Sequence, residues 1–171
     1  ARQCVAAAAS DAETDGSYSK ALDLYRAAGE YANALALANH AAADALSGAS
    51  RRAAVASQRT ATAGGSADDA LRLGGTIIAE ADAHGTPSPK LSAEEDALKT
   101  LKAAQQLLDA SARNDNRTAL AALHNLPLPL EPFRADSAAA RVPELHAAVK
   151  SLLPDLLLAA ARALHDEAGR R

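Results

Sequence analysis

Alanine and leucine supply most of the apolar side chains of this sequence, and this bias constrains the fold more than any other feature. The 171 residues include 48 Ala and 24 Leu, but only four Val, two Ile and one Phe, and no Trp or Met. Ala and Leu are among the best helix formers, whereas strands draw on β-branched and aromatic residues. The composition therefore predicts an all-α protein with a thin, alanine-packed core, and it makes all-β and α/β folds poor candidates.

Charge and cysteine content exclude several classes of function. The net charge is −3 and the isoelectric point is about 5.9, so the chain has no basic footprint for nucleic acid. Cys4 is the single cysteine, which removes disulfide frameworks and Cys-based zinc sites and fits a reducing compartment. No secretory signal or transmembrane segment is apparent, since charged residues and Pro154 break the apolar stretch at residues 152–164. Because the chain starts with Ala and lacks Met, we expect a piece of a longer protein.

Helical spacing of apolar residues predicts an antiparallel helix pair near the start of the chain. A first helix is expected over residues 1–10, before a polar interruption. A second begins at Tyr18 and ends at Gly29, a residue suited to the left-handed end of a helix. Tyr31 then starts a third helix almost at once, so the second and third form an αα-hairpin.

The chain is predicted to divide into three parts. Residues 1–46 form the helical hairpin region, and residues 47–66 form a flexible linker because no apolar stripe runs through them. Residues 67–171 form a C-terminal helical bundle. This bundle opens with a helix capped at Ser66 and ending near Gly85.

Glycine pairs and capping residues refine the next helices. Gly74 and Gly75 lie inside a helix, which predicts the close approach of another helix backbone. Ser92 followed by Glu95 forms a capping box, so a helix is expected to begin there. The acidic cluster at residues 94–96 would then lie in the first turn, where negative charge stabilises the helix dipole.

The last part of the chain carries the most regular apolar seam, stepping by three and four residues from Ala138 to Ala160. Proline interrupts it, so we expect either kinks or two helices that meet near Leu153, with Pro154 opening the second. The positions expected in the structural core along the whole chain are Leu22, Tyr25, Tyr31, Leu35, Ile77, Ile78, Leu98, Leu101, Leu108, Leu120, Val142, Leu145, Val149, Leu152 and Leu156.

Groups that carry chemistry are few and scattered. The five histidines are too far apart in the chain to pair at helical ligand spacing. Cys4 is expected to be a small buried hydrophobe, and the tyrosines at 18, 25 and 31 are expected to pack in the core. We predict no catalytic, cofactor-binding or metal-binding residues; which residues bind a partner is open.

Paired antiparallel helices with very short turns are typical of α-solenoids. The order of segments resembles the nucleoporin-interacting component (Nic) family, the large inner-ring scaffold nucleoporin of the nuclear pore complex. The segments that carry this resemblance are ARQC at Ala1, ALDLYRAAGEY, LALAN, Leu98–Leu108, Asn116–Leu120, the Leu128–Leu130 turn and Leu153–Ala159. The chain departs from the family in residues 12–15 and 47–66 and in its high alanine content.

This resemblance implies the C-terminal part of a longer solenoid of about seven helices, without enzymatic activity or a cofactor. It implies a scaffold at the nuclear envelope that supports pore assembly and nucleocytoplasmic transport, including protein and mRNA transport. The implied partners are other nucleoporins, namely a small membrane-associated inner-ring nucleoporin and neighbouring scaffold subunits. The alternatives are a tetratricopeptide-like peptide-binding adaptor and, more remotely, a helical hydrolase.

Overall fold

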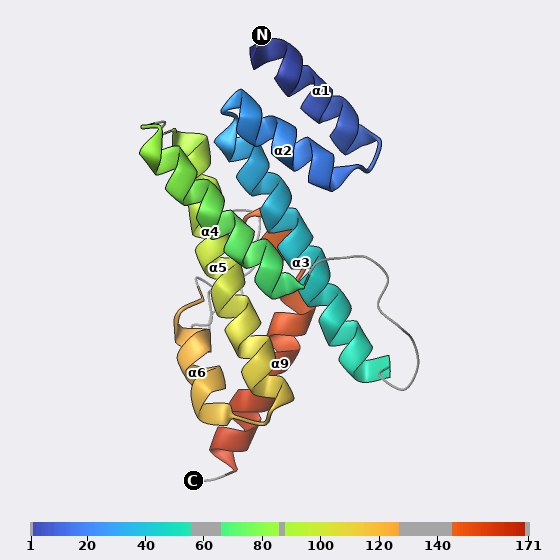
Figure 1. The fold of residues 1–171 in the computed structure, drawn as a ribbon. Coiled ribbons are helices and arrows are strands. Elements are labelled where there is room, and N and C mark those ends of the chain that lie inside the picture. The colour runs from blue at the N-terminus through green and yellow to red at the C-terminus, as the bar shows by residue number, and fades with distance from the viewer. Residues whose placement is uncertain (1, 56–65, 86–87, 127–144, 170–171) are drawn as a thin grey trace. The chain divides into compact units, whose positions relative to one another are not determined.

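Helices make up most of the part of the chain that the structure describes. The computed structural model describes residues 2–55, 66–85, 88–126 and 145–169, with the side chains of 49–55 excepted. These ranges hold eight helices and no strand, which confirms the all-α α-solenoid prediction (Figure 1). The helices are α1 (Arg2–Thr14), α2 (Tyr18–Ala28), α3 (Tyr31–Val55), α4 (Ala67–Ala83), α5 (Pro89–Ala112), α6 (Asn116–His124), α8 (Ala147–Lys150) and α9 (Leu153–Ala168).

The chain divides into two compact units. Unit 1 consists of Ala1–Ala42 with Gly65–Leu98, and unit 2 of Ala43–Gly64 with Lys99–Arg171. Both α3 and α5 contribute to both units, so the division differs from the one expected at residues 47–66.

The predicted linker needs correction at its beginning, because α3 continues to Val55. The absence of an apolar stripe does not stop a helix here, since alanine, serine and arginine allow it to propagate. The rest of the linker, residues 56–65, lies outside the described residues.

The α2–α3 hairpin of unit 1 follows the local signals of the sequence. Gly29 has a φ of 78°, and its N–H donates to the carbonyl of Arg26, so the predicted left-handed helix end is confirmed. Ser66 accepts a hydrogen bond from the Asp68 amide at the start of α4, as a capping serine should. The first helix is longer than expected, because α1 continues through the polar residues up to Thr14.

The start of α5 differs from the prediction. The helix begins at Pro89, one turn before Ser92, and the Ser88 hydroxyl accepts from the Leu91 amide at 3.1 Å. Proline is well suited to the first helical position, which outweighs the capping-box pattern three residues later. The acidic residues 94–96 consequently lie in the second turn and do not cap the helix.

A close contact in the core of unit 1 explains one of the two central glycines. A Cβ atom at Gly74 of α4 would lie 2.8 Å from Leu98 Cδ1 and 3.3 Å from Leu35 Cδ1. Leu98 and Leu35 are both buried, so their methyl groups fill the space that a side chain would need. The close approach predicted here is real, but it comes from leucine side chains and not from a helix backbone.

Unit 2 includes the C-terminal part of α5. Asn114, with a φ of 55°, ends that helix, and the Asp115 carboxylate caps α6 by accepting from the Thr118 amide. Hydrogen bonds from Thr118 hold the pKa of Asp115 below its ordinary value. The expected break in the final seam is present, since α8 ends at Lys150 and α9 begins at Leu153 with proline in its first turn.

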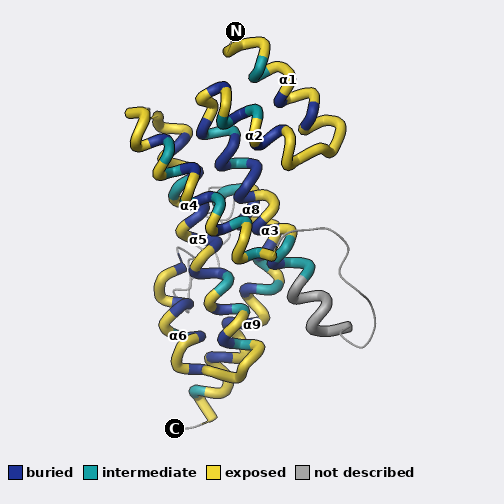
Figure 2. Tube along the Cα trace, in the orientation of Figure 1, coloured by how far each residue is buried: buried dark blue, intermediate teal, exposed yellow. Residues whose placement is uncertain are grey.

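Most residues of the expected core are buried in the structure (Figure 2). Two of the expected positions need correction: Leu108 is only half-buried while its neighbour Leu107 is buried, and Leu120 is only half-buried while Ala119 and Leu123 are buried. Ile78 and Leu145 are also half-buried, and Val142 lies outside the described residues. The buried members of the set are Leu22, Tyr25, Tyr31, Leu35, Ile77, Leu98, Leu101, Val149, Leu152 and Leu156.

Candidate protein-interaction site

Polar side chains in unit 1 join neighbouring helices. The Tyr25 hydroxyl of α2 donates a hydrogen bond of 2.9 Å to Glu13 Oε2 of α1. Burial, together with the nearby Glu13 carboxylate, raises the pKa of Tyr25. Tyr25 therefore stays a neutral donor and ties the polar end of α1 to the apolar face of α2.

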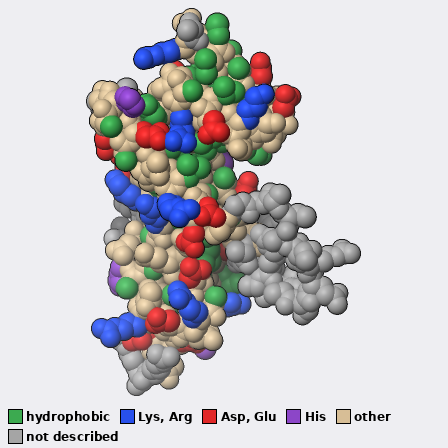
Figure 3. Space-filling view, in the orientation of Figure 1, with side chains coloured by type: hydrophobic (Ala, Val, Ile, Leu, Met, Phe, Trp, Pro, Cys, Tyr) green, Lys and Arg blue, Asp and Glu red, His purple; other side chains and the backbone are tan. Residues whose placement is uncertain are grey.

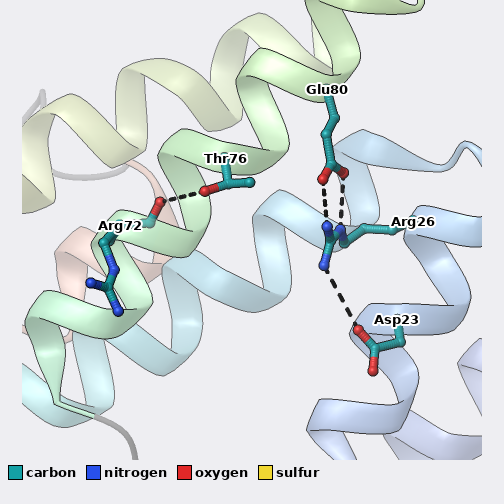
Figure 4. A network of polar contacts seen from close by, with 5 residues as sticks. All are labelled: Asp23, Arg26, Arg72, Thr76 and Glu80. Carbon is teal, nitrogen blue, oxygen red and sulfur yellow. Dashed lines mark hydrogen bonds and ion pairs between the residues drawn. The ribbon is translucent and has the colours of Figure 1, made fainter.

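A salt bridge connects α2 with α4 (Figure 4). Arg26 donates from Nε and Nη2 to the two oxygens of Glu80, with an Nε–Oε2 distance of 2.9 Å. Its Nη1 also lies 3.8 Å from Asp23 Oδ1. The bond from Arg26 lowers the pKa of Glu80, and the same bond raises the pKa of Arg26. Bidentate geometry makes this contact stronger and more directional than a single ion pair.

A buried polar pair joins α3 to α5. Asn39 is fully buried, and its Nδ2 donates to the Glu94 backbone carbonyl and to Glu94 Oε2, each at 2.9 Å. Asn39 Oδ1 is buried without a hydrogen-bond partner among the described residues. Glu94 is itself buried, so the interpretation of this residue as a helix-end charge is wrong. Sequence reasoning missed this pair, because its two residues meet only through the packing of two distant helices.

One polar contact in unit 2 joins α6 to α9. Asn116, at the start of α6, is buried and donates from Nδ2 to Asp166 Oδ2 at 3.1 Å. The same face of α9 is packed by Leu156 and three alanines. The beginning of α6 is thereby held against the C-terminal part of α9.

In the described ranges of the chain, side chains that could carry chemistry do not converge on one place. No group of three or more His, Cys, Asp or Glu residues suited to a metal occurs among the described residues. His84 stacks on Tyr31, with ring centroids 5.8 Å apart, and His146 caps α8. Two expectations need correction, because Cys4 is exposed and Tyr18 is 59% exposed. Tyr18 is the first residue of α2.

The surface combines mixed charge with a few exposed apolar side chains. On the face drawn in Figure 3, basic and acidic side chains are interspersed. Apart from Tyr18, the large exposed hydrophobic residues in the described part of the chain are Leu157, Leu158 and Leu164, all on α9. None of the described helices is long and apolar enough to cross a membrane.

Helix pairs whose polar side chains join neighbouring helices define a class of protein, the α-solenoid scaffold, which works through its surfaces. The chain belongs to the Nup93/Nic96 family, whose model matches residues 1–170. This confirms the resemblance to the Nic family seen in the sequence. The family is one of structural nucleoporins, which are components of the nuclear pore complex, and is not a family of enzymes. Comparisons with curated proteins and with solved structures gave no match.

Proposed function

We propose that this chain is a scaffold segment of the inner ring of the nuclear pore, located at the nuclear envelope. In this role it supports pore assembly and nucleocytoplasmic transport by binding other nucleoporins and carries out no catalysis. The match of the family model to residues 1–170 is the observation that carries the proposal. The direct partners are a small membrane-associated inner-ring nucleoporin and neighbouring scaffold subunits.

The structure supports a scaffold role through the use of its polar groups. Contacts such as Tyr25–Glu13, Arg26–Glu80 and Asn39–Glu94 join one helix to the next. Polar groups engaged in this way fix neighbouring helices in place. A solenoid of this construction offers extended surfaces for protein binding.

The proposal is tested by expressing the chain with a fluorescent tag and a proximity-labelling enzyme in cultured cells. We expect a nuclear-rim signal and labelling enriched in inner-ring nucleoporins. A Leu101→Asp control should lose both the rim signal and the labelling. Leu101 is fully buried, and an unpaired buried charge costs several kcal/mol of folding free energy. A diffuse signal with enrichment of heat-shock chaperones would refute the scaffold role and favour a peptide-binding adaptor.

A further inference from the structure

The buried pair of Asn39 and Glu94 has apolar neighbours along both of its helices. Asn39 of α3 is fully buried, and Glu94 of α5 is 7% exposed. The residues that flank the pair at spacings of three or four positions are all buried and apolar: Leu35 and Ala42 on α3, and Leu91 and Leu98 on α5. The pair is therefore a polar contact within apolar surroundings in the core of unit 1.

The pair uses only part of its hydrogen-bonding capacity. Asn39 Nδ2 donates to two oxygens of Glu94, whereas Asn39 Oδ1 is buried with no hydrogen-bond partner among the described residues. A buried amide oxygen that has lost its water without gaining a donor is destabilising. Turning the amide over makes this worse, because the oxygen then faces the two acceptors of Glu94. Replacing both members of such a pair by apolar groups of the same shape is typically neutral or stabilising.

The hydrogen bonds of the pair depend on the alignment of α3 with α5. A displacement of one helix by one turn, about 5.4 Å, would bring Asn39 beside a flanking leucine of α5 and Glu94 beside a flanking apolar residue of α3. The amide and the carboxyl group would then both be buried without each other, which is costly. Leucine and alanine contacts are non-directional and tolerate exchange of one apolar neighbour for another, so they discriminate less between alignments.

The other contacts between these helices specify the alignment more weakly. Lys90 Nζ of α5 donates to Asn33 Oδ1 of α3 at 2.6 Å, but this contact is exposed, and water replaces its partners at little cost. The space over Gly74 is filled by methyl groups of Leu35 and Leu98, and other leucine side chains supply the same groups. The buried polar pair is thus the contact with the strictest geometric requirement.

We propose that the Asn39–Glu94 pair is an alignment device, which fixes one register of α3 against α5 and contributes little to the net stability of unit 1. Loss of one member is costly because it leaves the other buried without its partner. Loss of both members removes the preference for one register and leaves the helices packed. This inference concerns the fold of the chain and is independent of its role in the nuclear pore.

The test compares the wild type with the double variant Asn39→Leu, Glu94→Met, whose side chains keep the branching of asparagine and the length of glutamate. Nitroxide labels on Ala41→Cys of α3 and Ser92→Cys of α5, both exposed positions, report the alignment in a Cys4→Ser background. Electron paramagnetic resonance should give one narrow distance for the wild type. The double variant should give a broadened or two-component distribution, because one turn displaces a helix by about 5.4 Å.

Urea unfolding of the unlabelled proteins separates alignment from stability. The double variant should unfold at a urea concentration at or above that of the wild type. Asn39→Leu alone should unfold at a lower concentration, because Glu94 then loses the amide donor. Glu94→Gln keeps an acceptor for Asn39 Nδ2 and should therefore retain the single narrow distance.

A core change elsewhere in unit 1 serves as the matched control. Leu71→Met on α4 alters a buried side chain at nearly constant volume and should leave the single distance unchanged. One narrow distance in the double variant would overturn the proposal, because apolar packing alone would then set the register. A double variant that is unfolded, or that unfolds at as low a urea concentration as Asn39→Leu, would also overturn it, because the pair would then be a net source of stability.

Discussion

The buried pair of Asn39 and Glu94 allows a sharp test of how α3 and α5 are held together. In Asn39→Asp the side chain keeps its shape, but the donor Nδ2 is replaced by an oxygen. That oxygen faces the Glu94 carbonyl and carboxylate, which the wild-type amide contacts at 2.9 Å each. Three acceptors then meet without a proton between them in a buried position.

The expected cost follows from the two hydrogen bonds that are lost. A hydrogen bond to a charged group contributes about 1.5–3 kcal/mol and one to a neutral carbonyl about 0.5–1.5 kcal/mol, so the loss is about 2–4.5 kcal/mol at neutral pH. This is a large fraction of the stability of a small helical protein. Urea unfolding followed by circular dichroism at 222 nm measures the change in the free energy of unfolding.

The matched control restores a donor on the other helix. In the double variant Asn39→Asp with Glu94→Gln, the new amide of residue 94 donates to the new carboxylate of residue 39. Much of the lost stability should return, so that the double variant is more stable than Asn39→Asp alone. If Asn39→Asp unfolds at the same urea concentration as the wild type, or if Glu94→Gln makes it worse, the pair does not hold the two helices as described.

Three further predictions concern single contacts. Glu80→Gln should cost about 1 kcal/mol at pH 7, since Arg26 and Glu80 are about one third exposed and solvent screens their attraction. Because Arg26 lowers the pKa of Glu80, the stability from this salt bridge is fully present above pH 4.5, the ordinary pKa of a glutamate. It is lost as the pH falls through the lower pKa of the folded state. Equal stability of the wild type and the variant at pH 7 would contradict this prediction. Gly74→Val should destabilise by about 1–3 kcal/mol through overpacking, and an unchanged thermal midpoint would show that the leucines around it move aside freely. Leu107→Ala should cost about 2–5 kcal/mol, and clearly more than Leu108→Ala in the same urea titration, because Leu107 is fully buried and its neighbour is not.

Local signals in the sequence predict helix ends well where one residue decides the outcome. Gly29 ends α2 and Ser66 starts α4 as expected, because a left-handed glycine and a capping serine act through the backbone next to them. The predicted start of α5 is wrong because two local signals compete. The Ser88–Pro89 pair outweighs the capping box that follows it. Pro89 is the signal that identifies the correct start of α5, because proline favours the first helical position.

Contacts between distant residues could not be predicted from spacing alone. The apolar stripe of α5 includes both Leu107 and Leu108, and only packing decides that the first is buried. The acidic residues 94–96 have the composition that is typical of the first turn of a helix. The burial of Glu94 depends on Asn39 of α3, which is distant in the sequence and donates a hydrogen bond to it.

The turn between α2 and α3 has a mechanical consequence. Only Gly29 and Glu30 separate the two helices, and the amides of both donate to carbonyls in the last turn of α2. A connection this short, with its backbone already bonded, leaves no slack to be drawn out when one helix is pulled. The direction in which α3 leaves α2 is therefore constrained by the turn itself.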